Sequence, residues 1–208
     1  FGKYANHDFQ NALDDLLPQK LIPVVVQLSE IPGRQKVHDL TREQRQSLLR
    51  VLKHFPGYGN NADTHTGIAQ DSRSLAELEG KDLLPFATGI QAGCGAVMVG
   101  HVIVEAMDGS LPASLSPAVH EYLRDTMGFT GVIMTDDLVM QAITDQYGAG
   151  EAAVMAVLAG NDLLCSTEYA TQYQAVLQAV LDGRISVDTL NAAVRHVLVW
   201  KQQVASYG

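Results

Sequence analysis

The sequence lacks the features that mark disulfide-stabilised, membrane-spanning or nucleic-acid-binding proteins. Its 208 residues include only two cysteines, Cys94 and Cys165, too few for a disulfide framework, and their apolar surroundings predict buried thiols. No apolar run is long enough to cross a bilayer. Lys and Arg number 14 against 23 Asp and Glu, and the basic residues form no cluster. This composition argues against a nucleic-acid partner, because phosphate binding needs clustered positive charge.

The length and the 47% apolar composition fit one globular domain with a sizeable core. Five short apolar runs, rich in β-branched residues, predict buried strands: 21–26, 51–55, 95–99, 131–135 and 160–164. They alternate with helical patterns, which indicates an α/β fold with a parallel sheet and helical crossovers. Five strands are fewer than the eight of a closed (β/α)8 barrel.

The expected helices have recognisable beginnings and ends. Ser116 followed by Pro117 is a favoured start, and Gly128 ends that helix. A kink is expected at Pro85 within a single helical pattern over 72–93. The remaining helices are expected at 8–17, 41–50, 150–159, 169–181 and 186–201.

A glycine-rich loop follows the strand at 51–55. It contains Pro56, Gly57, Gly59 and Gly67, which disfavour both helix and strand and predict a shaped loop.

Four titratable side chains accompany this loop: Lys53, His54, Asp63 and His65. A carboxylate beside an imidazole fixes its tautomer and stabilises the imidazolium. Histidine also titrates near neutrality, so Asp63 and His65 together are suited to proton transfer. We interpret the loop as half of an active site.

The other half is expected where the later strands end, because function gathers at the C-terminal ends of parallel strands. Polar residues stand at these positions, namely His101, Asp136 and Asp137, and Asp162 lies within its expected strand. These residues also have structural alternatives. His101 could be a hydrogen-bonded histidine of the core, Asp137 could cap the following helix, and Asp162 could be a buried hydrogen-bond acceptor. Asp136 lies at a strand tip, where its carboxylate could act as a nucleophile, a metal ligand or an electrostatic stabiliser.

Several motifs together resemble the glycoside hydrolase family 3 β-N-acetylglucosaminidases of the NagZ type. The resemblance covers about residues 52–201. The matching motifs are Lys53-His54-Phe55-Pro56-Gly57, Asp63-Thr64-His65, Gly100-His101, Pro112-Ala113-Ser114-Leu115-Ser116-Pro117, Met134-Thr135-Asp136-Asp137-Leu138 and Ala159-Gly160-Asn161-Asp162.

This resemblance implies a (β/α)8 TIM-barrel type of fold that holds the whole active site. It implies that Asp136 is the nucleophile that forms a glycosyl-enzyme, and that His65, paired with Asp63, is the general acid/base. A histidine then replaces the second carboxylate of most retaining glycosidases. The implied substrate-binding residues are Lys53, His54, His101, Arg34 and Met140.

The implied reaction is double displacement with retention, releasing terminal β-linked N-acetylglucosamine from peptidoglycan-derived, muropeptide-like fragments. The resemblance implies no metal and no organic cofactor, a carbohydrate as partner, and a monomer where the barrel is complete. Unpaired cysteines favour a reducing compartment such as the cytoplasm. A lipoprotein whose leader has been removed would give the same sequence.

The resemblance weakens upstream. Residues 1–50 match the early barrel portion poorly, with Arg34 in the nearest match to a substrate-binding glycine-arginine, whereas 51–208 match the C-terminal barrel portion of a single catalytic domain. Roughly twenty residues separate Arg34 from Lys53, where the family has about two more βα units. Either segments are missing from the sequence or the chain is a fragment. An open half-barrel would expose strand edges and need a partner.

Three alternatives stay open. A metal hydrolase is compatible with the ligand types of His54, Asp63, His65 and Asp136, but their spacing matches no metal motif. A non-catalytic sugar-binding or assembly module is favoured by the missing barrel units. Within the family, β-glucosidase, β-xylosidase and phosphorylase activities remain, and the pair of Asp63 and His65 favours the hexosaminidase branch.

Overall fold

The computed structural model describes residues 50–59 and 67–205. All of them fall within one compact unit, residues 37–208. Their elements, in chain order, are β1 (Val51–Phe55), β2 (Gln70–Asp71), α4 (Leu75–Gly80), α5 (Leu84–Gln91), β3 (Ala96–Val99), β4 (Ile103–Val104), the 3-10 turn η2 (Ala113–Leu115), α6 (Pro117–Glu121), the π-helical turn η3 (Tyr122–Thr126), β5 (Val132–Thr135), α7 (Gln141–Thr144), α8 (Ala149–Ala159), α9 (Tyr169–Leu181) and α10 (Val187–Ala205).

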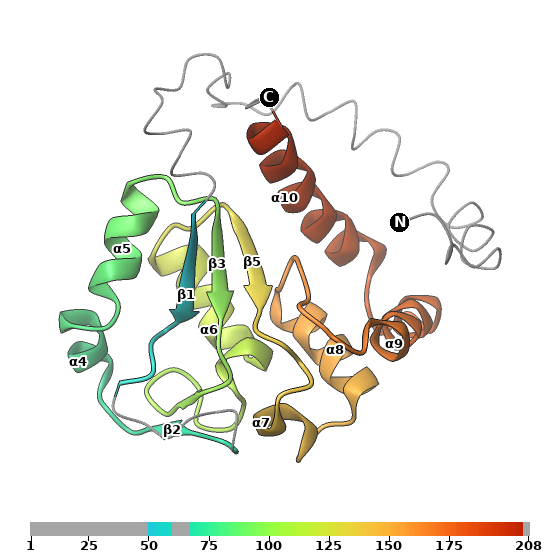
Figure 1. The fold of residues 1–208 in the computed structure, drawn as a ribbon, viewed down its shortest axis with the longest axis horizontal. Helices are drawn as coiled ribbons and strands as arrows, with labels where there is room; N and C mark the ends of the chain where they lie inside the picture. The colour runs from blue at the N-terminus through green and yellow to red at the C-terminus, as the bar shows by residue number, and fades with distance from the viewer. Residues whose placement is uncertain (1–49, 60–66, 206–208) are drawn as a thin grey trace. The chain divides into compact units, whose positions relative to one another are not determined.

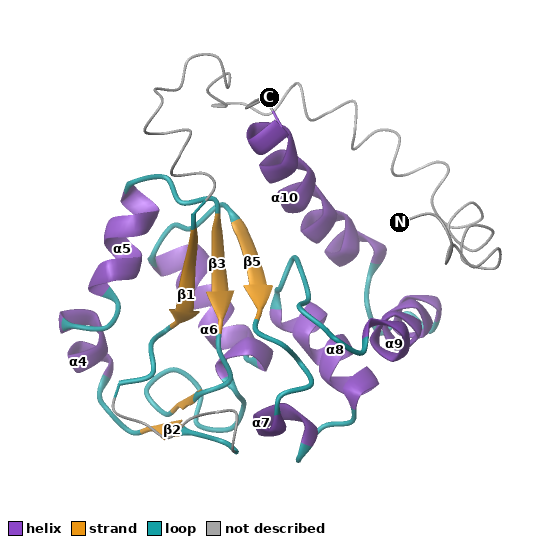
Figure 2. Ribbon diagram, viewed as in Figure 1, coloured by secondary structure: helices purple, strands orange, loops and turns teal. Residues whose placement is uncertain are grey.

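The main sheet is parallel, with the strand order β1-β3-β5. Val51 lies beside Ala96, which lies beside Val132. Figure 1 shows the three strands running in the same direction, and Figure 2 shows that helices connect and surround them. The predicted α/β architecture and the predicted strands at 51–55, 95–99 and 131–135 are confirmed.

Both faces of this sheet are covered by apolar side chains, which explains why its strands are nearly continuous apolar runs. On one face, Val97, Val99 and Ile133 pack with residues of α4, α5 and η3 in the largest buried cluster. On the other face, Val132 and Met134 pack with α10. The α10 residues in this second cluster are Val197 and Trp200.

Helix α8 is rich in small residues, and it packs closely against α9. Ala152, Ala153 and Ala156 are fully buried, because their short side chains let neighbouring helices approach. Gly160 ends the helix with a φ of 110°, a left-handed conformation that favours glycine. The predicted helix at 150–159 is therefore confirmed, as are those beginning at 116 and spanning 169–181 and 186–201.

The single helical pattern expected over 72–93 is wrong, because the structure has two helices there, α4 and α5. Pro85 lies in the first turn of α5. Proline has no N–H to donate and its φ suits a helix start, so it begins a helix at this position instead of kinking one.

The strand expected at 160–164 is reduced to one isolated bridge, between Met134 and Leu163. The Asp162 carboxylate accepts the Ile133 N–H at 2.8 Å, so a side chain takes a bond that a regular strand partner would supply. The short parallel pair β2-β4 was not predicted. Each of its strands has two residues, which is too short for a periodic pattern.

The cysteine prediction is half wrong. Cys94 is buried, but Cys165 is exposed. The elements expected at 8–17 and 21–26, and nearly all of the one at 41–50, lie outside the described residues. Among the described helices, none is long and apolar enough to cross a bilayer.

Candidate active site

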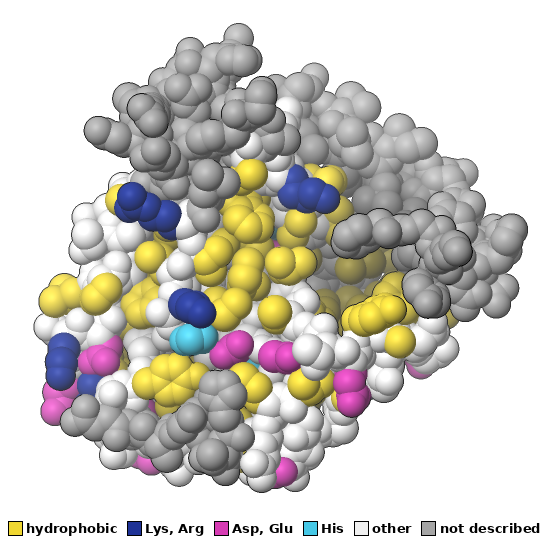
Figure 3. Space-filling model, viewed as in Figure 1, with side chains coloured by type: hydrophobic (Ala, Val, Ile, Leu, Met, Phe, Trp, Pro, Cys, Tyr) yellow, Lys and Arg dark blue, Asp and Glu magenta, His cyan; other side chains and the backbone are white. Residues whose placement is uncertain are grey.

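Two of the predicted site residues meet at the C-terminal ends of the sheet strands. His54 belongs to β1, and Asp136 directly follows β5. The imidazole Nε2 of His54 lies 3.3 Å from Oδ2 of Asp136, and the two side chains are 27% and 19% exposed. Figure 3 shows basic, histidine and acidic side chains gathered in one band on this face. Both side chains are therefore accessible to a ligand.

The position of His54 is fixed by its neighbours in the sequence and across the sheet. Phe55 is fully buried and packs edge-on against Phe86, with 5.1 Å between ring centroids. The ring of Tyr58 meets the His54 ring edge-on at 5.6 Å. A Cβ at Gly100 would lie 3.3 Å from the His54 Cβ and 3.4 Å from the Tyr58 hydroxyl, so glycine there permits this close approach.

Asp136 is held at the strand end by its own backbone. Its N–H donates to the Val99 carbonyl at 3.0 Å, which continues the pairing of β3 with β5. Its Oδ1 accepts the N–H of Asp137 at 2.8 Å. The preceding Thr135 is buried, and its hydroxyl oxygen accepts the N–H of Cys165 at 2.9 Å.

Asp137 organises the turn that follows. Its Oδ1 accepts the N–H of Val139 at 3.2 Å and that of Thr167 at 3.4 Å. Its carbonyl accepts the N–H of Met140 at 3.1 Å. Met140, not Asp137, is the N-cap residue of α7, so the helix-cap alternative for Asp137 is wrong. Asp137 instead joins two loops at this edge of the sheet.

His101 lies beneath this edge, fully buried. Its Nδ1 is 2.7 Å from the Ser114 hydroxyl and its Nε2 is 3.0 Å from the Asp137 carbonyl. Burial lowers the pKa of His101, and the bond to Asp137 and the nearby carboxylates only partly oppose this shift. The ring is therefore neutral near pH 7. Substrate binding by His101 stays a prediction, and both of its ring nitrogens already have protein partners.

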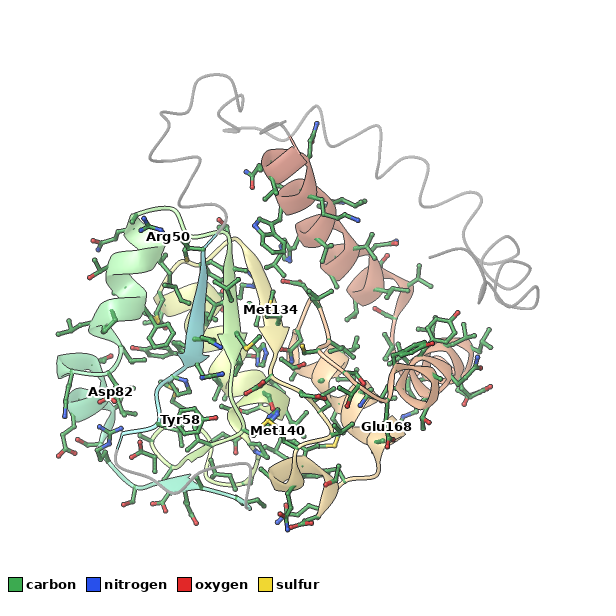
Figure 4. All side chains as sticks on the ribbon, in the orientation of Figure 1. Arg50, Tyr58, Asp82, Met134, Met140 and Glu168 are labelled. Carbon is green, nitrogen blue, oxygen red and sulfur yellow. The ribbon has the colours of Figure 1, made fainter. Side chains whose placement is uncertain are left out.

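The remaining predicted residues divide into two groups. Lys53 is exposed on β1, and Met140 is half-buried. Figure 4 shows Tyr58 and Met140 beyond the C-terminal ends of the strands. Arg34, Asp63 and His65 lie outside the described residues.

The glycine-rich loop rests on an ionic cluster that the sequence analysis did not identify. Arg73 binds the Asp71 carboxylate through Nε and Nη2 and donates through Nη1 to Asp82 at 2.6 Å. Hydrogen bonds to Asp71 and then to Asp82 raise the pKa of Arg73, against the effect of burial. A Cβ at Gly59 would collide with Nη2 of Arg73, and one at Gly57 would lie 3.1 Å from the Asp82 Cβ. The guanidinium thus packs directly against the backbone at Gly59.

A second polar cluster lies at the opposite end of β5. Asp162 accepts hydrogen bonds from Arg124 at 2.6 Å and pairs with His196 of α10 at 2.7 Å. Arg124 also donates to the carbonyls of Phe129 and Gly131, just before the strand. The alternative of Asp162 as a buried hydrogen-bond acceptor is confirmed.

This second cluster lines a cavity of about 420 Å³. Of the candidate residues named from the sequence, only Asp162 lies there, and its side chain is occupied by Arg124, His196 and the Ile133 N–H. We assign the active site to the His54–Asp136 edge instead, because the C-terminal strand ends carry function in parallel folds. Within residues 50–59 and 67–205, no three His, Cys, Asp or Glu side chains are arranged to hold a metal ion.

Comparison with known proteins identifies the family. The glycosyl hydrolase family 3 N-terminal domain matches residues 29–199. A β-hexosaminidase of Nitrosomonas eutropha is 37% identical over 150 residues, covering 68% of this chain and 43% of the relative. The β-hexosaminidase LpqI of Mycobacterium tuberculosis is 35% identical over 164 residues, covering 74% of this chain and 42% of the relative.

A solved structure, a glycoside hydrolase family 3 β-N-acetylglucosaminidase from a Paenibacillus species, superposes with a TM-score of 0.72 at 39% identity. The match covers 76% of this chain and 31% of that one. The chain thus spans less than half the length of these relatives, and its parallel sheet with helical crossovers is part of a TIM-barrel type of fold. The chain belongs to the glycosyl hydrolase family 3 N-terminal domain family.

Proposed function

We propose that this protein is a retaining glycoside hydrolase that removes terminal β-linked N-acetylglucosamine. The observation that carries the proposal is the placement of Asp136: a partly open carboxylate at a strand tip, 3.3 Å from His54. Its Oδ1 accepts the Asp137 N–H, which fixes the orientation of the carboxylate, and an aspartate carboxylate can act as the nucleophile of a glycosidase. The relatives named β-hexosaminidase support the choice of sugar.

In the proposed mechanism, Asp136 attacks the anomeric carbon and a glycosyl ester forms as the bond to the leaving oxygen breaks. His65, held by Asp63, gives a proton to that oxygen and then removes one from the water that hydrolyses the ester. Two inversions retain the configuration. Lys53 and His54 would bind sugar hydroxyls at the same strand end.

Two further substrate contacts are proposed from the resemblance alone. Met140 would supply an apolar contact at this edge, and Arg34 a charged one. We also propose peptidoglycan-derived fragments as the natural substrates, and a mechanism that needs no metal.

The first test is hydrolysis of p-nitrophenyl β-N-acetylglucosaminide by the 208-residue chain with EDTA present. We expect turnover, and we expect Asp136→Asn to lower kcat by about 10³-fold or more, because the glycosyl ester cannot form. Asp145→Asn is the matched control, since Asp145 is an exposed carboxylate at the end of α7. Sugar binding without turnover would support the non-catalytic alternative, and loss of activity in EDTA would support the metal hydrolase.

The second test separates the acid/base role from the nucleophile. His65→Ala should slow hydrolysis severely for aryl glycosides with poor leaving groups and much less for dinitrophenyl glycosides, which leave without a proton. An equal loss across the aryl series would contradict the assignment of His65.

A further inference from the structure

The hydrogen bonds of His101 determine where its proton lies. Its Nε2 faces the Asp137 carbonyl at 3.0 Å, and a carbonyl oxygen can only accept, so Nε2 carries the hydrogen. In the neutral ring Nδ1 is then the acceptor, and the Ser114 hydroxyl donates to it across 2.7 Å. The ring is fully buried, so no water competes for either bond.

Ser114 fixes the far side of the ring to the protein core. Ser114 is itself fully buried. Its N–H donates to the Gly100 carbonyl at 3.0 Å, and its carbonyl accepts the Asn161 side-chain amide at 2.8 Å. The same Asn161 amide donates to the Ala156 carbonyl at the end of α8. Through Ser114, His101 is thus linked to Asn161 and to the last turns of α8, which are distant from it in the sequence.

On the near side, His101 is the only buried side chain among the described residues that donates to the Asp137 carbonyl. The peptide units on both sides of Asp137 are restrained: one through this carbonyl, the other through the N–H that Asp137 donates to Oδ1 of Asp136 at 2.8 Å. Displacing Asp137 would therefore redirect the hydrogen bond that orients the Asp136 carboxylate.

We propose that His101 is a positioning residue, which holds Asp137 and through it aims the Asp136 carboxylate, and that it does not bind substrate. This inference rests on the proposed function in that it takes Asp136 as the nucleophile. The charged and titratable groups that act electrostatically on the ring are Asp136, Asp137 and His54. Because both ring nitrogens of the neutral His101 are hydrogen-bonded, the ring holds the Asp137 carbonyl at a fixed distance from Ser114.

Two amide substitutions separate the bonds of His101. A glutamine side-chain nitrogen reaches the position of histidine Nε2, whereas an asparagine nitrogen reaches only the position of Nδ1. His101→Gln keeps the donor to Asp137, and His101→Asn loses it. We expect His101→Gln to retain at least about a tenth of the wild-type kcat and His101→Asn to lose about 10²-fold, with KM little changed in both, because misplacing a catalytic group slows the chemical step.

The matched control is His120, which is also buried and donates from Nδ1 to a backbone carbonyl, that of Ser116, at 2.8 Å. It borders the cavity at the other end of β5. His120→Gln and His120→Asn should lower stability and leave kcat and KM unchanged. Unfolding in urea, measured for all four variants, separates a general loss of stability from a loss of positioning.

Nitrogen NMR of the imidazoles provides a readout that needs no activity. At neutral pH the His101 ring should show the neutral tautomer with hydrogen on Nε2, and it should titrate below the ordinary histidine pKa of about 6.5. The amide signals of Asp136 and Asp137 should move in His101→Asn and stay close to the wild type in His101→Gln.

Different outcomes contradict different statements. A raised KM with unchanged kcat in the His101 variants, or equal kcat values for His101→Gln and His101→Asn, would overturn the positioning role. So would a ring that is charged at neutral pH or carries its hydrogen on Nδ1. A wild-type chain without hydrolysis contradicts the proposed function instead, and the NMR measurement then still decides whether His101 holds Asp137.

Discussion

At the scale of single residues, Arg73 joins two carboxylates beside the glycine-rich loop. Asp71 is 2% exposed, and Arg73 contacts it with two nitrogens while also binding Asp82. Removing one partner of a buried ion pair leaves an uncompensated charge. We expect Arg73→Ala to lower the free energy of unfolding by about 3 kcal/mol, measured by urea denaturation.

A matched control for Arg73→Ala exists on the surface. Arg184 binds Glu151 with equally short contacts, but both side chains are 49% exposed. Exposed pairs contribute little because water and salt screen them, so Arg184→Ala should lower the free energy of unfolding much less than Arg73→Ala does. Equal losses in the two variants would mean that the burial of Asp71 does not decide the effect.

Single residues also show what the sequence could predict. Asp136 and His54 were predictable because each follows or ends an apolar strand, and parallel strand ends meet at one edge. The cluster of Arg73, Asp71 and Asp82 was not, because nothing in a polar stretch shows which charges face each other. Tyr58 stood within the predicted loop, and only its contact with His54 distinguishes it from any loop aromatic.

At the scale of elements, helix α6 begins at a cap that also binds a carboxylate. The Ser116 oxygen accepts the Val119 N–H, and its hydroxyl donates to Asp108 at 2.6 Å. Burial raises the pKa of Asp108, but hydrogen bonds from Ser110, Ser116 and two backbone N–H groups outweigh it, so the pKa is lowered. Ser116→Ala should lower the free energy of unfolding by about 1–2 kcal/mol.

The Asp108 carboxylate adds a pH dependence to this element. A carboxyl group with a lowered pKa in the folded state stabilises the protein above its unfolded pKa of about 3.9 and loses that effect as pH falls through the folded value. The stability difference between wild type and Asp108→Asn should therefore be largest at neutral pH and shrink below about pH 4. Urea denaturation across pH measures it, and a difference that grows in acid would contradict this account.

Elements were predictable where a pattern was long or a cap was specific, as for Ser116-Pro117. They were not predictable where tertiary contacts decide. Pro85 is compatible with a kink or with a helix start, and only the packing of the neighbouring helices selects between them. The stretch 160–164 is apolar like a strand, but the side chain of Asp162 bonds to Ile133 and leaves a bridge.

At the scale of the molecule, the main sheet has one open edge within the described residues, that of β1. There, β1 pairs only with β3, and Val51 is 38% exposed. Unpaired edges favour association with another chain. We expect sedimentation velocity of the 208-residue chain to show association that increases with concentration and that Val51→Lys reduces.

The control for Val51→Lys is Leu181→Lys, which adds the same charge at a 51% exposed leucine at the end of α9, away from any strand edge. It should leave association unchanged. A single monomeric species at every concentration would instead indicate that the edge of β1 is covered, as in a complete barrel.

The contact between Arg124 and Asp162 also has a consequence for the order in which β5 is stabilised during synthesis. Arg124 fixes the backbone just before β5, yet its carboxylate partner lies 38 residues further along the chain. During synthesis the chain emerges from its N-terminus, so β5 leaves the ribosome before the side chain that secures it. The strand that precedes Asp136 can pair with β3 as soon as it is made, but it gains the Arg124–Asp162 contact only after residue 162 has been added.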